Sequence, residues 1–304
     1  MQNFKSPLFS IVIANYNYGR FLEDAIKSVI AQGMGDKVEL IICDAASTDN
    51  SVEVIKKYAN GLPPNISYTD WINSSSNNSQ TPPLITWWCS EKDGGQSAAF
   101  NKGFLHARGR FLTWLNADDV LFPGALQAVA AEISRYPTCE WFTGSSAYMD
   151  SEMKLTRFFC AHQFSIFRAR YGMLMVGGPS SFFSRRLLDV VGGVDEQLHF
   201  LMDIDLWYKF FSRTGAKYQR TRKPVFAFRI HSMSKMSGAD VEDSESNMLH
   251  RQQAAKELAL LEQRYCLKPA ITRKFSTILT FSLFDKIYSL WSERKVKGRF
   301  VYYA

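Results

Sequence analysis

The sequence lacks the cysteine pattern of a disulfide scaffold or of a zinc site. Its five cysteines are odd in number and widely spread, and no two of them form a Cys-x-x-Cys pair. Small secreted scaffolds and structural zinc sites need cysteines paired at short spacing. We therefore expect reduced thiols.

The sequence also lacks the long apolar run of a membrane-spanning helix. No stretch reaches the roughly 18 uninterrupted apolar residues that a span needs. Residues 1–5 lead into a strand-like segment without the apolar core of a signal peptide. Both absences favour a cytoplasmic location.

A glycine-rich loop is missing after the first predicted strand. The motif Gly-x-Gly-x-x-Gly would follow that strand in a nicotinamide-dependent oxidoreductase, because its glycines let the backbone approach a pyrophosphate. The segment Ala14-Asn-Tyr-Asn-Tyr-Gly19 occupies this place instead. The Gly-rich basic loop of a nucleotidyltransferase is absent from the same position, so neither class fits.

Basic residues are not spread over the chain, although the net charge is +7. Residues 268–304 hold eight Lys and Arg against Asp285 and Glu293, which gives +6 for this segment. A nucleic-acid-binding protein would need basic residues along a structured groove or a recognisable module. We expect no nucleic-acid partner.

Apolar runs of strand length alternate with helical patterns in the first 120 residues. The predicted strands cover residues 10–14, 38–43, 84–88 and 110–115. Nearly all-apolar strands are typical of a parallel sheet that is covered on both faces. The sequence thus predicts an α/β fold with a Rossmann-like sheet and helices on both faces. Residues 70–83 are polar and turn-rich, and they predict an exposed loop.

Polar residues follow each of the four strands at the point where it ends: Tyr16 with Asn17, Asp44, Asp93, and Asp118 with Asp119. The carboxyl ends of parallel strands meet at one edge of a sheet, where ligands bind in open α/β folds. This convergence predicts a nucleotide-binding crevice.

The pair Asp118 and Asp119 lies in the segment Asn116-Ala-Asp-Asp119, directly after the fourth strand. Two adjacent carboxylates are costly unless a positive charge joins them. Mg²⁺ or Mn²⁺ is a natural partner, since such ions take one or two carboxylates and leave positions for phosphate oxygens and water. The alternative is an acidic turn in which Asp119 caps the next helix.

After Pro123 the regular alternation is lost. Strand-like runs occur near residues 140–144, 154–159, 179–183 and 225–231, and helical patterns prevail from residue 242 onward. We predict a mixed extension of the sheet and then a helical C-terminal tail.

Six segments occur in the order found in family 2 glycosyltransferases with the GT-A fold, and the sequence resembles that family over about residues 7–236. They are Ile13-Ala-Asn-Tyr-Asn17, Asp44-Ala-Ala-Ser-Thr-Asp49, Asp93 to Gly103, Asn116 to Asp119, Met202-Asp-Ile-Asp-Leu-Trp207 and Arg229-Ile-His231. The sequence departs from the family at Ala14, often proline, at Ala45, often a second acid, and at Met202, often glutamate.

The resemblance implies a divalent metal, Mn²⁺ or Mg²⁺, that neutralises the leaving diphosphate as a Lewis acid. Asp119 would bind it directly, with Asp118 on the ribose or on a metal-bound water. His231 would contact the metal or a phosphate, or else pack in the core. Arg229 would lie close to the diphosphate.

Other residues of these segments would bind the nucleotide sugar. Asp44 and Asp93 would accept from a base N–H and from ribose hydroxyls, or else cap turns. Tyr16 would pack on the base or in the core, and Asn17 belongs to the same loop. Asn101 and Gly103 would allow the diphosphate to approach, or Gly103 would ease helix packing.

The family resemblance also implies inversion at the anomeric carbon, with a general base that takes the proton of the acceptor hydroxyl. Asp203 is the candidate, although Asp203 or Asp205 could instead cap the following helix. We expect a nucleotide-sugar-binding half over residues 1–122, an acceptor-binding half over 123–238, and a helical basic extension over 239–304.

The sequence as a whole predicts a metal-dependent inverting glycosyltransferase that uses a nucleotide diphosphate sugar, with UDP favoured. Its acceptor would be a glycan or lipid-linked hydroxyl in cell-envelope polysaccharide synthesis. The alternative is an inactive sugar- or nucleotide-binding protein of the same fold.

Apolar residues between Ile271 and Trp291 lie among the basic residues of the tail. This pattern fits peripheral contact with an anionic membrane, or a helix packed on the enzyme.

Overall fold

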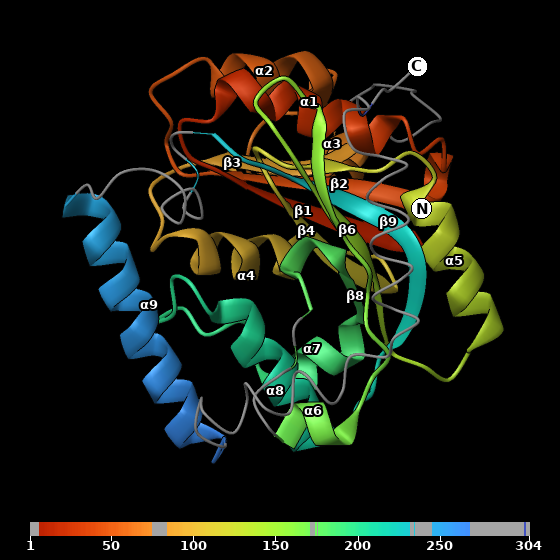
Figure 1. Ribbon diagram of the computed structural model, residues 1–304. Helices are drawn as coiled ribbons and strands as arrows, with labels where there is room; N and C mark the ends of the chain where they lie inside the picture. Colours follow the sequence, from red (N-terminus) through yellow and green to blue (C-terminus); the bar gives the residue numbers. More distant parts are fainter. Residues whose placement is uncertain are drawn as a thin grey trace.

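The computed structural model describes residues 6–74, 84–170, 174, 176–231, 234, 245–267 and 301. A nine-stranded mixed sheet runs through these residues in the order β3-β2-β1-β4-β8-β6-β9-β5, with β7 paired to β6 (Figure 1). The predicted α/β class and the mixed extension of the sheet are confirmed.

Four parallel strands form the first half of the sheet: β1 (Phe9–Asn15), β2 (Val38–Asp44), β3 (Ile85–Ser90) and β4 (Phe111–Asn116). They are buried on both faces because apolar side chains point both ways. In β1, Ile11 and Ile13 enter one core and Val12 enters the other.

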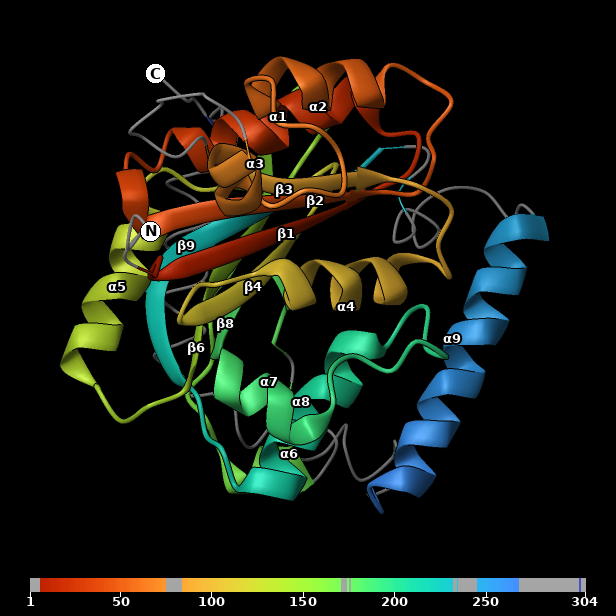
Figure 2. The ribbon, with the colours of Figure 1, turned by 180° about the vertical axis from the view of Figure 1, so that it is seen from behind.

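Helices cover both faces of these strands, as Figures 1 and 2 show from opposite sides. On one face lie α1 (Gly19–Ile30), α2 (Ser51–Ala59) and α3 (Tyr68–Ser74); on the other lies α4 (Gln96–His106). Helix α3 begins just before residues 70–83, the stretch for which the sequence predicts a loop, and occupies its first five residues. Its start is marked by Ser67, whose Oγ accepts from the backbone N of Asp70 at 3.1 Å and donates to the Asp70 carboxylate at 2.6 Å.

The second half of the sheet is mixed. Its strands are β5 (Val120–Leu121), β6 (Trp141–Met149), β7 (Leu155–Phe159), β8 (Ser181–Ser184) and β9 (Gln219–Arg229). β8 is antiparallel to β4 and β6, whereas β9 is parallel to β6 and antiparallel to β5.

The sheet curls back on itself. Only residues 117–119 separate β4 from β5, so the two strands lie within about 15 Å of each other along the chain. Three other strands nevertheless stand between them in the sheet order. The curl brings the end of β9 beside the end of β4, which is where the Asp pair lies.

The remaining helices are α5 (Ala125–Arg135), α6 (Ile166–Arg170), α7 (Arg185–Val191), α8 (Met202–Thr214) and α9 (Glu245–Arg264), with 3-10 turns η1 (Gly35–Lys37) and η2 (Gly178–Ser180). Strands from both sides of residue 122 share the one sheet. The predicted domain limits stay a prediction. The apolar and basic tail segment lies outside the described residues, among which no helix is long and apolar enough to cross a bilayer.

A tryptophan stack fixes α8 against the sheet. The indole of Trp207 in α8 lies parallel to that of Trp114 in β4, with ring centroids 5.6 Å apart, and 5.3 Å from that of Trp141 in β6. All three rings are buried. Large aromatic surfaces packed in this way fix helix position through both buried area and ring geometry.

Gly103 gives a test of the packing between α4 and β1. A Cβ at this position would lie 2.3 Å from Val12 Cγ1, so a methyl group would push the helix off the sheet. We expect Gly103→Ala to lower the free energy of unfolding by about 1–3 kcal/mol, as overpacking does. Chemical denaturation measures this. Gly94→Ala is the control, because its Cβ would meet only Ala98 Cβ at 3.4 Å; an equal loss in both variants would contradict the packing argument.

Candidate active site

Asp44 lies at the end of β2 and is fully buried. Its carboxylate accepts from Asn15 Nδ2 at 2.6 Å, from the Ser47 backbone N at 3.0 Å and from Ser90 Oγ at 2.6 Å. The residue therefore ties together the ends of β1, β2 and β3. A contact between Asp44 and the nucleotide base stays a prediction. A nucleobase here would meet a carboxylate that already accepts hydrogen bonds from protein groups.

The loops after β1 and β2 are hydrogen-bonded to each other. Asn17 has a left-handed backbone conformation (φ 56°), its N–H donates to Ser47 Oγ at 2.8 Å, and its Oδ1 accepts from the Thr48 N–H at 2.8 Å. Asn tolerates this conformation better than most residues. Beside this junction the side chain of Tyr16 is 59% exposed, so its ring is free to cover a bound base.

Asp119 is fully buried where β4 meets β9. One carboxylate oxygen accepts from the Arg229 backbone N at 3.0 Å, and the other accepts from Asn116 Nδ2 at 2.8 Å. Gln96 Nε2 donates to Asn116 Oδ1 at 2.8 Å, which sets the orientation of the Asn116 amide. Burial and the neighbouring charge of Asp118 raise the pKa of Asp119 well above its usual value, against these donors.

Asp118 points to a different partner. Its Oδ2 lies 3.1 Å from Nε2 of His231, whose ring packs against Phe21 and Tyr18 at centroid distances of 4.5 and 5.7 Å. The Asp118 side chain is 13% exposed. A carboxylate oxygen and an imidazole nitrogen thus meet at the carboxyl edge of the sheet, a donor pair that suits a divalent ion.

Arg229 contacts the cluster around Asp118 and His231, here called the Asp118 corner. Its guanidinium donates to the Asp118 carbonyl oxygen at 2.9 Å, pairs with Asp24 of α1 at 2.9 Å, and lies 4.7 Å from the ring centroid of Phe21. The residue is only 2% exposed. In this arrangement the guanidinium binds protein groups, and a contact with a diphosphate stays a prediction.

Asp203 lies in the first turn of α8, four residues before Trp207 and therefore on the same side of the helix. The residue is half-buried, and its Oδ1 accepts from the Ile204 N–H at 2.7 Å. Desolvation raises its pKa to about 6, although the N–H groups of Ile204, Asp203 itself and Gly178 act in the opposite direction. A carboxyl group with this pKa suits proton transfer near neutral pH.

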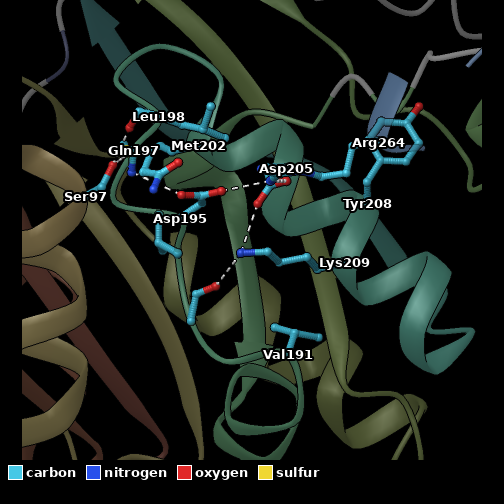
Figure 3. A network of polar contacts seen from close by, with 12 residues as sticks. Ser97, Val191, Asp195, Gln197, Leu198, Met202, Asp205, Tyr208, Lys209 and Arg264 are labelled. Atoms are coloured by element: carbon cyan, nitrogen blue, oxygen red, sulfur yellow. Dashed lines mark hydrogen bonds and ion pairs between the residues drawn. The ribbon is translucent and has the colours of Figure 1, made fainter. Parts of the chain in front are cut away.

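Asp205 is engaged elsewhere. Its carboxylate is buried and pairs with Lys209 Nζ at 3.0 Å and with Arg264 at 2.6 Å (Figure 3). It also accepts from the Tyr265 hydroxyl at 2.7 Å. Protein groups thus occupy this carboxylate, which leaves it little room to contact a substrate hydroxyl. Between the two acids considered from the sequence, this geometry favours Asp203 as the base.

Asp93 lies just before α4, and Asn101 lies in the middle of that helix. Asp93 Oδ1 accepts from the Gly95 N–H at 2.8 Å in an exposed turn. The Asn101 amide exchanges two hydrogen bonds of 2.9 Å with the backbone of Val194. Donor contacts by both residues stay predictions, and Asn101 serves here to hold the loop before α8.

Three residues at the Asp118 corner were not singled out from the sequence: Tyr18 and Phe21, which flank His231, and Asp24, which pairs with Arg229. Two of them, Phe21 and Asp24, lie in α1, about 200 residues from their partners. Helical periodicity shows only which residues share a face, so no signal in the sequence identified these contacts.

The family model for glycosyl transferase family 2 matches residues 10–192. The chain belongs to this family. An uncharacterised glycosyltransferase of Nostoc sp. is 38% identical over 120 residues, which cover 40% of this chain and 31% of that protein's length.

Two solved structures share the fold. TarS of S. aureus in complex with UDP-GlcNAc aligns with a TM-score of 0.53 at 15% identity, over 95% of this chain and 81% of that one. The mannosyltransferase PcManGT of Pyrobaculum calidifontis, in complex with GDP-Man and Mn²⁺, aligns with a TM-score of 0.52 at 15% identity, over 94% and 84%. The GT-A fold and glycosyltransferase membership expected from the sequence are confirmed.

Ala46 offers a test of strain in the loop after β2. It has φ 56°, a left-handed conformation in which a Cβ costs roughly 1–2 kcal/mol. We expect Ala46→Gly to raise the free energy of unfolding by about 0.5–1 kcal/mol, since glycine removes this strain but gains freedom in the unfolded chain. Thermal unfolding checks the sign. Ala45→Gly, at a residue without positive φ, should destabilise instead; stabilisation by both changes would contradict the strain argument.

Proposed function

We propose that the protein is a metal-dependent, inverting glycosyltransferase that moves a sugar from a nucleotide diphosphate to a hydroxyl acceptor. The observation that supports this most is the meeting of Asp118 and His231 at the carboxyl edge of the parallel strands. Asp203 adds a carboxyl group of raised pKa on α8, the helix that packs on β4 through Trp207.

Mn²⁺ or Mg²⁺ would be held by Asp118 and His231, with Asp118 in place of the Asp119 suggested by the sequence. Both oxygens of Asp119 already accept from protein donors at full burial, whereas Asp118 retains solvent access. Among the described residues no three His, Cys, Asp or Glu side chains converge on one point. Two protein ligands agree with ions that take their remaining ligands from phosphates and water. When bound, the ion would neutralise the leaving diphosphate.

Asp203 would act as the general base. Its carboxylate takes the proton of the acceptor hydroxyl while that oxygen attacks the anomeric carbon, and the bond to the nucleotide diphosphate breaks with its electron pair. One displacement inverts the anomeric configuration. Arg229 and Asp119 would keep the end of β9 on the end of β4, so that His231 stays beside Asp118.

The donor would be a UDP-sugar in the first instance, since a structural neighbour binds UDP-GlcNAc. Tyr16 would cover the base, and Asp44 and Asn17 would shape the loops beneath it. Asp93 would reach the ribose from the turn before α4. A second neighbour binds GDP-Man with Mn²⁺, so GDP-sugars belong in the same screen.

The acceptor would be a glycan or lipid-linked hydroxyl. The enzyme would work in the cytoplasm, and its basic tail would hold it on the inner face of the membrane if the tail binds anionic lipid. A glycan acceptor agrees with the similarity to the chondroitin synthase of Pasteurella multocida, which is 26% identical over 228 residues that cover 74% of this chain and 21% of that protein's length. The second candidate, a binding protein without turnover, is disfavoured by the raised pKa of Asp203, which a mere binding site does not need.

Two substitutions separate the metal ligand from the buried acid. Asp118→Asn should abolish both sugar transfer to water from UDP-GlcNAc and the Mn²⁺-dependent part of UDP binding, with little change in melting temperature. Asp119→Asn should instead lower the free energy of unfolding by about 1–3 kcal/mol, because its new NH₂ group would face the NH₂ group of Asn116. Calorimetry with UDP and Mn²⁺, together with thermal unfolding, distinguishes them. Metal-dependent UDP binding of wild-type strength in Asp118→Asn would refute the assignment.

The raised pKa of Asp203 predicts the pH dependence of turnover. A general base acts only when deprotonated, so kcat should be at a plateau above pH 7, half-maximal near pH 6, and should fall about tenfold per pH unit below it. Asp203→Asn should lower kcat by roughly 10²–10⁴ at pH 7.5 and remove this ionisation. A nucleotide-sugar hydrolysis assay across pH 5–8 measures both. An unchanged profile in Asp203→Asn would assign the ionisation to another group.

A further inference from the structure

Helix α9 lies beyond the segment matched by the family model, yet it contacts the loop that leads into α8. This loop, residues 193–201, directly precedes Met202 and Asp203. In Figures 1 and 2 α9 stands at the edge of the molecule, next to α8 and far from the sheet. One of the side chains that makes these contacts, Glu257, is buried.

Glu257 makes the most specific of these contacts. The side chain is 3% exposed, and its carboxylate accepts from three consecutive backbone N–H groups, those of His199, Phe200 and Leu201, each at 2.9 Å. Burial by itself would raise the pKa of Glu257, but these donors outweigh it and lower the pKa. The carboxylate thus binds the unpaired N–H groups just before the first turn of α8.

Arg264, the last residue of α9, makes the second contact. Its guanidinium donates to Asp195 at 2.8 Å and to Asp205 at 2.6 Å, so it joins the loop to α8 (Figure 3). Lys209 completes the network, since its Nζ lies 3.0 Å from Asp205 and donates to the Gly193 carbonyl oxygen at 3.2 Å. The loop is therefore fixed to α8 by charge as well as by backbone hydrogen bonds.

Helix α4 holds the opposite side of the same loop. Ser97 Oγ donates to the Leu198 carbonyl oxygen at 2.7 Å and lies 2.9 Å from Met202 Sδ, as Figure 3 shows for the labelled residues. Asn101 binds Val194 on the same helix face. The loop thus lies between α4, which begins at the proposed donor site, and α9, which does not reach that site.

We propose that Glu257 and Arg264 are positioning residues for Asp203: α9 fixes the first turn of α8 and so sets where the base meets the acceptor hydroxyl. The inference rests on the proposed function, because it takes Asp203 as the base. It assigns to the C-terminal helix a role in turnover, separate from donor binding at Asp44 and Asp118. Misplacing a catalytic group by about 1 Å costs on the order of 10²-fold in rate.

The test uses Glu257→Gln and Arg264→Lys in the full chain, with Lys256→Gln as the matched control at an exposed neighbouring position. Three measurements are made on each: hydrogen exchange of peptides covering residues 195–206, UDP binding with Mn²⁺, and the pH profile of UDP-GlcNAc hydrolysis. Melting temperatures identify a variant that fails to fold. If Glu257→Gln fails to fold, the measurements on Arg264→Lys, which keeps the charge, decide the outcome.

We expect Glu257→Gln to speed exchange at residues 198–204, lower kcat by about 10- to 100-fold, and move the half-maximal pH of hydrolysis, with the Kd for UDP within twofold of wild type. Arg264→Lys should show smaller changes of the same kind, and Lys256→Gln none. A wild-type kcat and pH profile in Glu257→Gln would overturn the inference but not the proposed function. Parallel losses of UDP binding and kcat in this variant would have the same consequence. Equal rates for wild type and Asp203→Asn would overturn the base assignment and the inference with it.

Discussion

The structure depends on a carboxylate buried where the two halves of the sheet meet. Asp119 accepts from the backbone of Arg229 in β9 and from Asn116 at the end of β4, although 110 residues separate it from Arg229. A buried carboxylate without donors would cost several kcal/mol, so the sheet must close for Asp119 to be tolerated. Once closed, the same contact sets Asp118 and His231 face to face. The position of the proposed metal site is thus a consequence of how the sheet curls.

Much of the parallel half could be predicted from the sequence, because its strands are short apolar runs and its helices carry a clear apolar stripe. Polar residues at four successive strand ends predicted a nucleotide-binding crevice, which stays a prediction. The different roles of Asp118 and Asp119 could not be predicted, since adjacent acids look alike until a distant strand covers one of them. Asp203 and Asp205 posed the same problem, because two of the partners that distinguish Asp205, Arg264 and Tyr265, lie about 60 residues after it. Helix α3 was missed because its sequence is polar and its start signal is a single Ser-x-x-Asp.

Aromatic packing links α8 to the parallel half of the sheet. Trp207 carries α8 onto Trp114 of β4, and the next residues of β4 lead to the Asp pair. Gly178 lies against this stack, with no room for a side chain: a Cβ would approach the Trp114 ring to 2.6 Å. The backbone of Gly178 can therefore reach the carboxyl group of Asp203. The absence of a side chain at Gly178 thus serves both the packing against Trp114 and the placement of a backbone N–H beside Asp203.

The pairing of β9 between β6 and β5 also has a consequence for the order of folding. The first four strands pair with one another within residues 9–116, but β5 gains its partner only when residues near 226 are available. During synthesis the chain emerges from its N-terminus, so β1 to β4 can form while Asp119 still lacks the Arg229 N–H. Contacts of such long sequence separation form slowly. A nascent chain that ends before β9 would hold the loops around Asp44 but not the Asp118 and His231 pair, so the two parts of the candidate site would form one after the other as the polypeptide grows.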